Sequence, residues 1–270
     1  MNTTYNKIHA EHPNWEFPRF TEKIFRVKNS KYVVCVFVIN EGEKIKKQIK
    51  NMSIYDEQVD IVIADGGSTD GSLEPRFLEK NNIRALLTKK GSGKLSAQMR
   101  MAFAWALSEG YLGVIVVDGN GKDDISAIPS FVALLDQGYD HIQGSRYIPG
   151  GKAVNTPKLR HAGLKLIHSP LISIASGKKH TDTTNGFRAY SASLLNDKKI
   201  AVFRDIFQTY ELHYYLAIES SRNKKYKVTE TPVTRTYPKT GKTPTKISPI
   251  KGNMSIMKIL LLAVLGKYKK

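Results

Sequence analysis

Two aspartates that are each followed by glycine could carry chemistry in this sequence. Asp65 begins the segment DGGSTDG, and Asp118 begins the segment DGN. A carboxylate can accept hydrogen bonds from a base or a ribose, or help to hold a divalent cation. Glycine lets the backbone approach a ligand closely. The two segments therefore indicate a nucleotide site that is built from acids.

Both aspartates follow apolar runs that read as buried strands. Residues 60–64 and 113–117, like 32–39 and 83–87, lack polar alternation, which is typical of strands covered on both faces of a parallel sheet. The segments between these runs have apolar residues at helical spacing. This order predicts an α/β fold with a mostly parallel central sheet, flanked by helices and joined by right-handed crossovers. Ligands of such sheets lie beyond the carboxyl ends of the strands, where Asp65 and Asp118 stand.

The remaining segments have weaker patterns. Residues 1–30 show no period, so we expect an irregular arm that packs its aromatic side chains on the domain. The other expected elements are a helix at 125–135, a strand at 141–143, a helix at 159–175, a loop and strand at 181–190, a helix at 205–219, a strand at 227–235 and an apolar helix at 255–265.

Composition places the chain among ordinary globular proteins. It has 270 residues, of which 41% are hydrophobic, enough for one large α/β domain. The single cysteine, Cys35, excludes an intrachain disulfide and fits a reducing compartment. The amino-terminal residues lack the apolar core of a secretory signal, and no run approaches the roughly 20 apolar residues of a spanning helix. We therefore expect a cytoplasmic protein.

The net charge of +18 is concentrated toward the carboxyl end. Residues 220–270 contain thirteen lysines and arginines and one acid, Glu230, so they carry twelve of these charges. Such a balance implies an anionic partner, which could be nucleotide phosphates, an anionic membrane surface, a phosphorylated lipid or nucleic acid. A basic face that only keeps the protein soluble is the alternative for the lysines taken singly.

Two common phosphate-binding motifs are incomplete. The segment GSGKLS at 91–96 resembles a P-loop, but the first glycine of that motif would fall at Thr88. Neither Gly91 nor Gly119 starts a complete G-x-G-x-x-G, since Ser96 and Asp124 occupy the last positions. An ATPase or a dinucleotide enzyme is therefore disfavoured.

Several motifs in fixed order carry a resemblance to a known family. NE at 40–41, DGGSTDG at 65–71 and DGN at 118–120 resemble family 2 glycosyltransferases of the GT-A fold. GSRY at 144–147 and TNGFRAY at 184–190 are similar to the dolichol- and polyprenyl-phosphate sugar synthase branch. The resemblance spans about residues 32–248. We accordingly divide the chain into an arm at 1–30, a GT-A domain at 31–252 and an apolar, basic helix at 253–270.

The resemblance implies roles for individual residues. Asp65 would contact the base, Glu41 would contact the nucleoside, and Asp70 would support their loop. Asp118 and Glu211 would be the catalytic residues. The implied donor-binding residues are Asn40, Glu41, Asp65, Gly66, Asp70, Lys94, Asp118, Gly119, Asn120, Arg146, Arg235, Lys242 and Lys246.

The resemblance also implies a divalent cation, Mg²⁺ or Mn²⁺. Asp118 would occupy the first position of the family's metal-binding D-x-D, whereas the second acid is Asn120 here. An amide oxygen carries no charge, so metal affinity would be weaker or the metal would be held differently. Asp123 and Asp124 could substitute, or they could cap the helix that starts near Ile125.

The reaction sets further requirements. Negative charge grows on the departing nucleoside diphosphate, and a cation or basic side chains must offset it. Arg235, Lys239, Lys242 and Lys246 form a basic segment that could do so and close over the donor. An acceptor hydroxyl would need a general base, for which Glu211 stands in the family's position. A lipid phosphate acceptor would need none, and Glu211 would then be positional.

These implications add up to one expected activity and two alternatives. We expect an inverting transferase that moves a sugar from a UDP- or GDP-sugar to a polyprenyl-phosphate or lipid-linked glycan in cell-envelope polysaccharide synthesis. A nucleotidyltransferase that makes nucleotide sugars is one alternative, and a basic protein that binds nucleic acid is the other. The helix at 255–265 could be a buried closing helix, or it could lie on the inner face of an anionic membrane.

Overall fold

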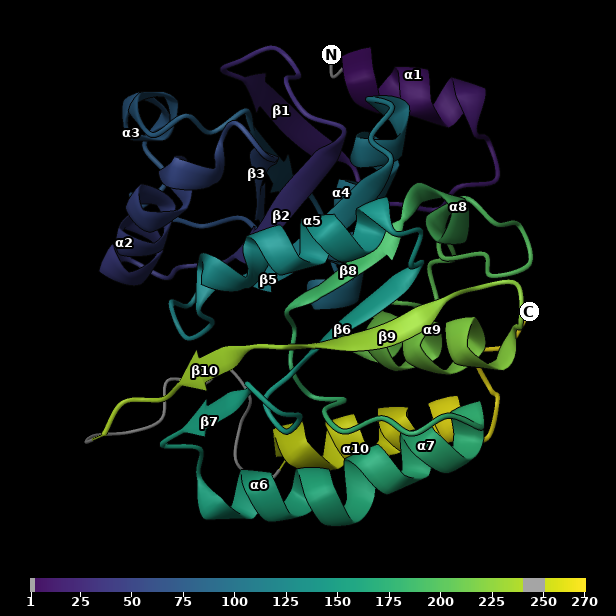
Figure 1. The fold of residues 1–270 in the computed structure, drawn as a ribbon. Helices are drawn as coiled ribbons and strands as arrows, with labels where there is room; N and C mark the ends of the chain where they lie inside the picture. Colours follow the sequence, from purple (N-terminus) through teal and green to yellow (C-terminus); the bar gives the residue numbers. More distant parts are fainter. Residues whose placement is uncertain (1–2, 240–250) are drawn as a thin grey trace.

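The computed structural model describes residues 3–239 and 251–270, and its centre is one eight-stranded sheet (Figure 1). The order across the sheet is β1-β4-β3-β2-β5-β8-β6-β9. The strands are β1 (Phe20–Ile24), β2 (Tyr32–Val38), β3 (Asp60–Asp65), β4 (Ala85–Lys89), β5 (Gly113–Asp118), β6 (His141–Ser145), β8 (Arg188–Ser191) and β9 (Val228–Pro232). A separate pair joins β7 (Lys152–Val154) to β10 (Thr234–Thr236) in parallel.

The sheet is mostly parallel, as predicted. β4, β3, β2 and β5 are parallel neighbours, and β6 pairs in parallel with β9. Only β1 and β8 run against their neighbours within the described residues. Strands β2 and β3 are buried over their full lengths, which explains why their sequences show no polar alternation.

Helices cover both faces of the sheet. They are α1 (Thr3–Glu11), α2 (Glu43–Met52), α3 (Pro75–Lys80), α4 (Leu95–Ser108), α5 (Ile128–Asp136), α6 (Lys158–Gly163), α7 (Ser169–Ser176), α8 (Ala192–Leu195), α9 (Glu211–Arg222) and α10 (Lys251–Val264). One hydrophobic core packs α4 and α9 against the sheet, and a second packs α2 and α5 on the opposite face. A third cluster joins α7, α9 and α10 at the lower side of Figure 1.

The amino-terminal residues are more regular than we expected. Residues 3–24 contain helix α1 and strand β1, and β1 extends the sheet by pairing antiparallel with β4. Trp15 does stack on Phe203, so the aromatic side chains pack on the domain as predicted. The expectation of an irregular arm was wrong because the five residues FTEKI form an exposed edge strand without a continuous apolar run.

Three predicted boundaries also differ from the structure. The strand expected at 83–87 is β4, two residues later. The helix expected from residue 205 begins only at Glu211, so the preceding segment is a loop. The strand expected at 227–235 is two strands in different sheets, β9 and β10, which Val233 separates. Among the described helices, none is long and apolar enough to cross a membrane.

Candidate active site

The two predicted acids lie on either side of the central strand β2. Asp65 ends β3 opposite Val38, and Asp118 ends β5 opposite Phe37. The loops that follow both strands therefore meet at one edge of the sheet, together with the loop that follows β2. This arrangement was predicted from the sequence alone.

The loop after β2 is fastened to the loop after β3. Asn40 has a φ of 48° and accepts a hydrogen bond at Oδ1 from the Thr69 amide, 2.8 Å away. The Ser68 hydroxyl accepts from the Asn40 amide at 2.9 Å and donates to Asp65 Oδ1 at 2.7 Å. Asp65 is 3% exposed, and its carboxylate thus holds the loop after β3, for which we predicted contact with the base.

Asp70 fastens the same two loops at a second point. Its Oδ2 accepts from the Gly42 amide at 2.8 Å, and its Oδ1 accepts from Ser72. Desolvation would raise the pKa of Asp70, but the hydrogen bonds from Ser72 and Gly42 outweigh it and lower that pKa. Glu41 lies between these contacts, 3.9 Å from Lys44 Nζ.

Main-chain contacts position the loop of Asp118. Gln48 Nε2 on α2 donates to the Asp118 carbonyl at 3.0 Å, and Gln48 Oε1 accepts from the Gly121 amide at 2.9 Å. A Cβ at Gly119 would lie 2.7 Å from Val38 Cγ2, so only glycine lets the loop pack this closely on β2. A Cβ at Gly186 would lie 3.1 Å from Asp118 Oδ1, which places the NGF segment beside the carboxylate.

Arg235 joins Asp118 to a second acid. Its Nη2 donates to Asp118 Oδ2 at 3.0 Å, and its Nη1 pairs with Asp123 Oδ2. The Asp118 side chain is 28% exposed, whereas that of Asp123 is 1% exposed. Desolvation lowers the pKa of Arg235, but the charges of Asp123 and Asp118 outweigh it and raise that pKa. The predicted donor-binding arginine therefore does lie at the predicted catalytic aspartate.

Further basic side chains surround Tyr237 beside this pair. Lys122 Nζ lies 5.4 Å from the centre of the Tyr237 ring, and the guanidinium carbons of Arg235 and Arg160 each lie 5.9 Å from it. Burial, followed by the charge of Arg235, lowers the pKa of Lys122. Burial would raise the pKa of Tyr237, but the charges of Arg235, Arg146 and Arg160 lower it. The site is therefore rich in positive charge.

The side chains at Asp118 do not form a dedicated site for a divalent cation. Asn120 turns its Nδ2 toward Asp118 Oδ2, 3.3 Å away, and its Oδ1 accepts from the Lys122 amide at 3.2 Å. Asp123 is paired with Arg235, and Asp124 caps the turn at Ser126. Across residues 3–239 and 251–270, no three His, Cys, Asp or Glu side chains are grouped for a metal. Asp118 and Asn120 thus offer one carboxylate and one amide, without the second acid of a D-x-D, so Mg²⁺ or Mn²⁺ here would depend on oxygens of the bound diphosphate.

Arg146 lies in a buried ion pair. Its Nε and Nη2 donate to Asp182 at 2.6 and 2.8 Å, and Nη2 also donates to Thr184. Glu230 supports the same loop by accepting from the Thr181 amide and hydroxyl. Contact of Arg146 with the donor stays a prediction, and the structure gives the residue a role in holding the loop at 181–184.

Glu211 is the first residue of α9. Both of its carboxylate oxygens accept hydrogen bonds from Thr209, one from the amide and one from the hydroxyl. Burial and the charge of Asp118 raise the pKa of the adjacent Tyr210, so the start of α9 lies near the predicted catalytic aspartate. Lys94 immediately precedes α4, and its amide donates to the Gln208 carbonyl in the loop before α9. The role of Glu211 as a base stays a prediction.

The predicted site and the observed site differ in some of their residues. Lys242 and Lys246 lie outside the described residues. Gln48, Gly186 and Tyr237 were not among the predicted site residues. Nothing in the sequence distinguishes Gln48 from other helix residues. Lys122, which was not predicted either, could have been found by its position four residues after Asp118.

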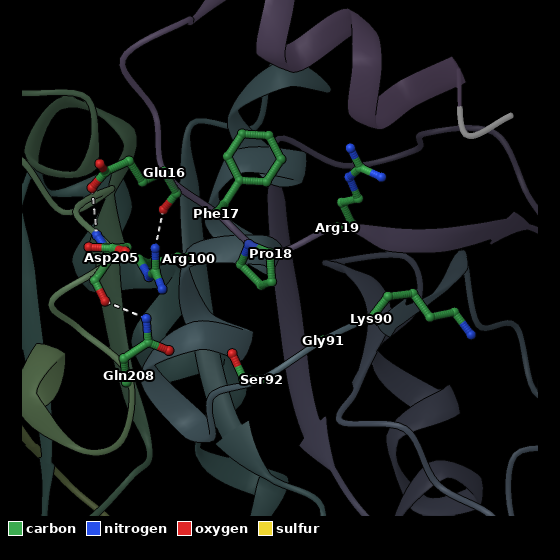
Figure 2. Close-up of a pocket in the computed structure, with 10 residues that line it drawn as sticks. All are labelled: Glu16, Phe17, Pro18, Arg19, Lys90, Gly91, Ser92, Arg100, Asp205 and Gln208. Atoms are coloured by element: carbon green, nitrogen blue, oxygen red, sulfur yellow. Dashed lines mark hydrogen bonds between the residues drawn. The ribbon is translucent and has the colours of Figure 1, made fainter.

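A cavity of about 420 Å³ has a lining that does not include the strand-end acids (Figure 2). It is bounded by the segment at 16–19, the loop at 90–92 and the segment at 205–208, and contains none of the predicted site residues. Figure 2 shows Arg100 reaching the carbonyl of Glu16, while the Glu16 carboxylate accepts from the Asp205 amide. These bonds fasten the amino-terminal segment to α4 and to the loop before α9.

Comparison with known sequences identifies the class of protein. Residues 33–198 match the family model described as glycosyl transferase family 2, and the chain belongs to that family. It is 29% identical over 161 residues to an undecaprenyl-phosphate mannosyltransferase from Micrococcus luteus, covering 58% of this chain and 64% of the relative. It is 27% identical over 167 residues to a polyprenol monophosphomannose synthase from Mycolicibacterium smegmatis, covering 60% and 62%. The match thus spans less than two thirds of either relative.

Solved structures support the fold assignment. Glucosyl-3-phosphoglycerate synthase from Mycobacterium tuberculosis, in complex with Mn²⁺, UDP-glucose and phosphoglyceric acid, superposes with a TM-score of 0.64 at 14% identity, covering 97% of this chain and 83% of that one. The same enzyme with Mg²⁺ and UDP gives 0.63, also at 14% identity, covering 97% and 82%. This likeness confirms the predicted GT-A fold, and at such identity it bears on the fold alone.

Proposed function

We propose that the protein transfers a sugar from a nucleoside diphosphate sugar to a polyprenyl phosphate. The observation that carries the proposal is the placement of Asp65 and Asp118 on either side of β2, with Arg235 at Asp118. The acids offer acceptors to a nucleoside, and the arginine offers a cation to its diphosphate. The names of the two relatives, which specify polyprenyl acceptors, support the choice of acceptor.

The chemistry follows from this arrangement. An acceptor phosphate oxygen forms a bond to the anomeric carbon on the face opposite the diphosphate, which inverts that carbon. The electron pair of the breaking carbon–oxygen bond leaves with the diphosphate, and basic side chains offset its charge. A phosphate acceptor is already ionised near pH 7, so no proton has to be removed. Glu211 is then a positioning residue, through its hydrogen bonds to Thr209.

The acceptor lipid would come from a membrane surface on the side of α6, α7 and α10. Over residues 158–180 and 251–270 the sequence contains no acid. The helices expose large apolar side chains, namely Leu159, Leu166, Ile174, Met254, Leu261 and Leu265. The opposite face of α10 packs Ile259 and Leu260 into the cluster with α7 and α9. Helix α10 is therefore half core and half exposed, which supports peripheral binding to anionic lipid at the inner face of the cytoplasmic membrane.

A two-stage experiment tests the proposed function. Thermal shifts with UDP, GDP, CDP and dTDP, each with and without Mg²⁺ or Mn²⁺, identify the base. Radiolabelled sugar transfer to undecaprenyl phosphate, with the matching sugar nucleotide, then tests the acceptor. We expect UDP or GDP to stabilise the protein in the first stage and a labelled lipid to form in the second. Such a lipid-linked sugar would serve cell-envelope polysaccharide synthesis.

Other outcomes point to the alternatives. Release of pyrophosphate from a nucleoside triphosphate and a sugar phosphate would support a nucleotidyltransferase instead. Salt-sensitive binding of DNA or RNA, without any shift by the nucleotides, would support a nucleic-acid-binding protein.

A further inference from the structure

If the function proposed above holds, on which this inference rests, the departing diphosphate needs positive charge near Asp118. In a D-x-D arrangement two carboxylates would hold a divalent cation for this purpose. Here the second position is an amide, and that amide hydrogen-bonds within the loop. Of the other nearby acids, Asp123 is 1% exposed and paired with Arg235, and Asp124 accepts a hydrogen bond from the Ser126 amide. The acids that could add to Asp118 are therefore already used.

Two cationic side chains lie near Asp118. Arg235 Nη2 lies 3.0 Å from Asp118 Oδ2. The centre of the Tyr237 ring lies 5.4 Å from Lys122 Nζ and 5.9 Å from the guanidinium carbon of Arg235, so both cations contact the same ring. Both are mostly buried, at 7% and 8% exposure, so their charges are less screened by water than those of surface lysines.

The backbone holds the two cations together. β10 runs alongside the loop after β5, where the Thr236 amide donates to the Lys122 carbonyl at 2.8 Å and the Asp124 amide donates to the Thr234 carbonyl at 2.9 Å. Asp123 and Arg235 form the bridge between these two bonds. Lys122 and Arg235 are thus fixed by paired main chains, as a preorganised site requires.

We propose that Lys122 and Arg235 supply the positive charge that binds the diphosphate of the sugar nucleotide, so that this enzyme binds its donor without a divalent cation. Asp118 then orients Arg235 through Oδ2. Lys122 offers its ammonium to the diphosphate oxygens, which are strong acceptors for charged donors. The sequence D-x-N-x-K at 118–122 is the signature of this arrangement.

Calorimetric titration of the full chain with UDP and GDP tests the proposal. One set of titrations contains EDTA, and a second contains Mg²⁺ or Mn²⁺. We expect the dissociation constant of the preferred nucleotide to agree within about twofold between the two sets, whereas a loss of more than tenfold in EDTA would overturn the inference. Binding in neither set would overturn the proposed function itself, and this inference with it.

Variants of Lys122 separate its role from general effects of charge. Lys122→Ala should weaken nucleotide binding about ten- to a hundredfold in EDTA, as expected for the loss of a charged hydrogen bond. Lys225→Ala removes a lysine that pairs with Asp197 away from the site, and should leave binding unchanged. Equal binding by Lys122→Ala and wild type would contradict the proposal, provided that thermal unfolding shows both to be folded.

A double variant tests the proposal through a gain of metal binding. Asn120→Asp combined with Lys122→Ala restores a second carboxylate and removes the competing ammonium. We expect electron paramagnetic resonance to detect nucleotide-dependent Mn²⁺ binding in this variant and not in wild type. Stoichiometric Mn²⁺ bound by wild type with UDP or GDP would refute the inference.

Discussion

The Gln48 side chain holds the main chain of Asp118, with Nε2 donating to the Asp118 carbonyl across 3.0 Å. Its other amide atom, Oε1, accepts from Gly121, so one side chain on α2 fixes the loop on both sides of Asn120. The carboxylate of Asp118 takes no part in these bonds. The position of the loop and the chemistry of its aspartate can therefore be separated by mutation.

Asp118→Ala should abolish sugar transfer and leave the fold intact. We expect a loss of at least about a hundredfold in kcat, because Arg235 loses the carboxylate that orients it beside the reacting diphosphate. Initial rates with the preferred sugar nucleotide measure this, and thermal unfolding checks the fold. Turnover near that of wild type would refute the assignment of Asp118 to the active site.

Glu211→Gln distinguishes the two kinds of acceptor. With a lipid phosphate, we expect kcat to stay within about threefold of wild type, because glutamine keeps an oxygen for Thr209 and no base is needed. A base that removes a hydroxyl proton contributes about a hundredfold or more. A loss of that size, measured over a pH series with undecaprenyl phosphate, would therefore make Glu211 the base.

Gly119→Ala should destabilise the protein. The new methyl carbon would lie 2.7 Å from Val38 Cγ2 and 3.1 Å from the Phe37 carbonyl, so the loop must move away from β2. We expect a loss of about 1–3 kcal/mol in the free energy of unfolding, measured in urea, together with slower transfer. Gly163→Ala is the matched control, since its methyl meets no atom within 4 Å in a helix, and it should not destabilise.

We expect the buried side chain of His180 to make the protein less stable in mild acid. Burial, followed by the charges of Arg188 and Lys178, lowers the pKa of His180 from 6.5 to about 4. Below pH 6.5 the unfolded chain therefore takes up a proton that the folded chain refuses until about pH 4. This contribution to stability is complete above pH 6.5 and falls by about 3 kcal/mol toward pH 4.

Urea unfolding of His180→Gln over this pH range measures that contribution. The variant should lose less stability between pH 6.5 and 4.5 than wild type. His9→Gln, which changes an exposed histidine of α1, should follow wild type. Identical slopes for His180→Gln and wild type would contradict the prediction.

Single substitutions test membrane binding better than deletion of residues 253–270. Deletion would also remove Leu260 from the core with Tyr214, so its effect on binding would be mixed with unfolding. Leu261→Glu and Leu166→Glu change side chains that are 44% and 76% exposed. Each should reduce partitioning onto phosphatidylglycerol vesicles by about tenfold or more.

The control for membrane binding is Leu112→Glu. Leu112 is 59% exposed and precedes β5, at the amino end of the sheet. We expect it to partition like wild type. If all three variants bind as wild type does, the surface formed by α6, α7 and α10 does not bind lipid.

The sequence predicted the parts of the site that follow long apolar strands. Asp65 and Asp118 could be placed because parallel strands bring their carboxyl ends to one edge, and burial on both faces leaves a clear pattern. The ion pair between Arg235 and Asp123 could not be foreseen. It depends on a change of pairing at Val233, after which the chain leaves β6 and pairs with β7 and with the loop after β5, and 112 residues separate the partners.

Strand β1 also has a consequence for the physical behaviour of the protein. It covers the open side of β4 with five paired residues, from Phe20 opposite Lys89 to Ile24 opposite Ala85. Its exposed residues include Lys23, a charge that discourages pairing with another chain. Removal of the first 30 residues would leave β4 with unpaired amides along this edge, and we expect self-association through it, measurable by light scattering. The family match begins only at residue 33, yet the segment before it pairs with the edge of the sheet.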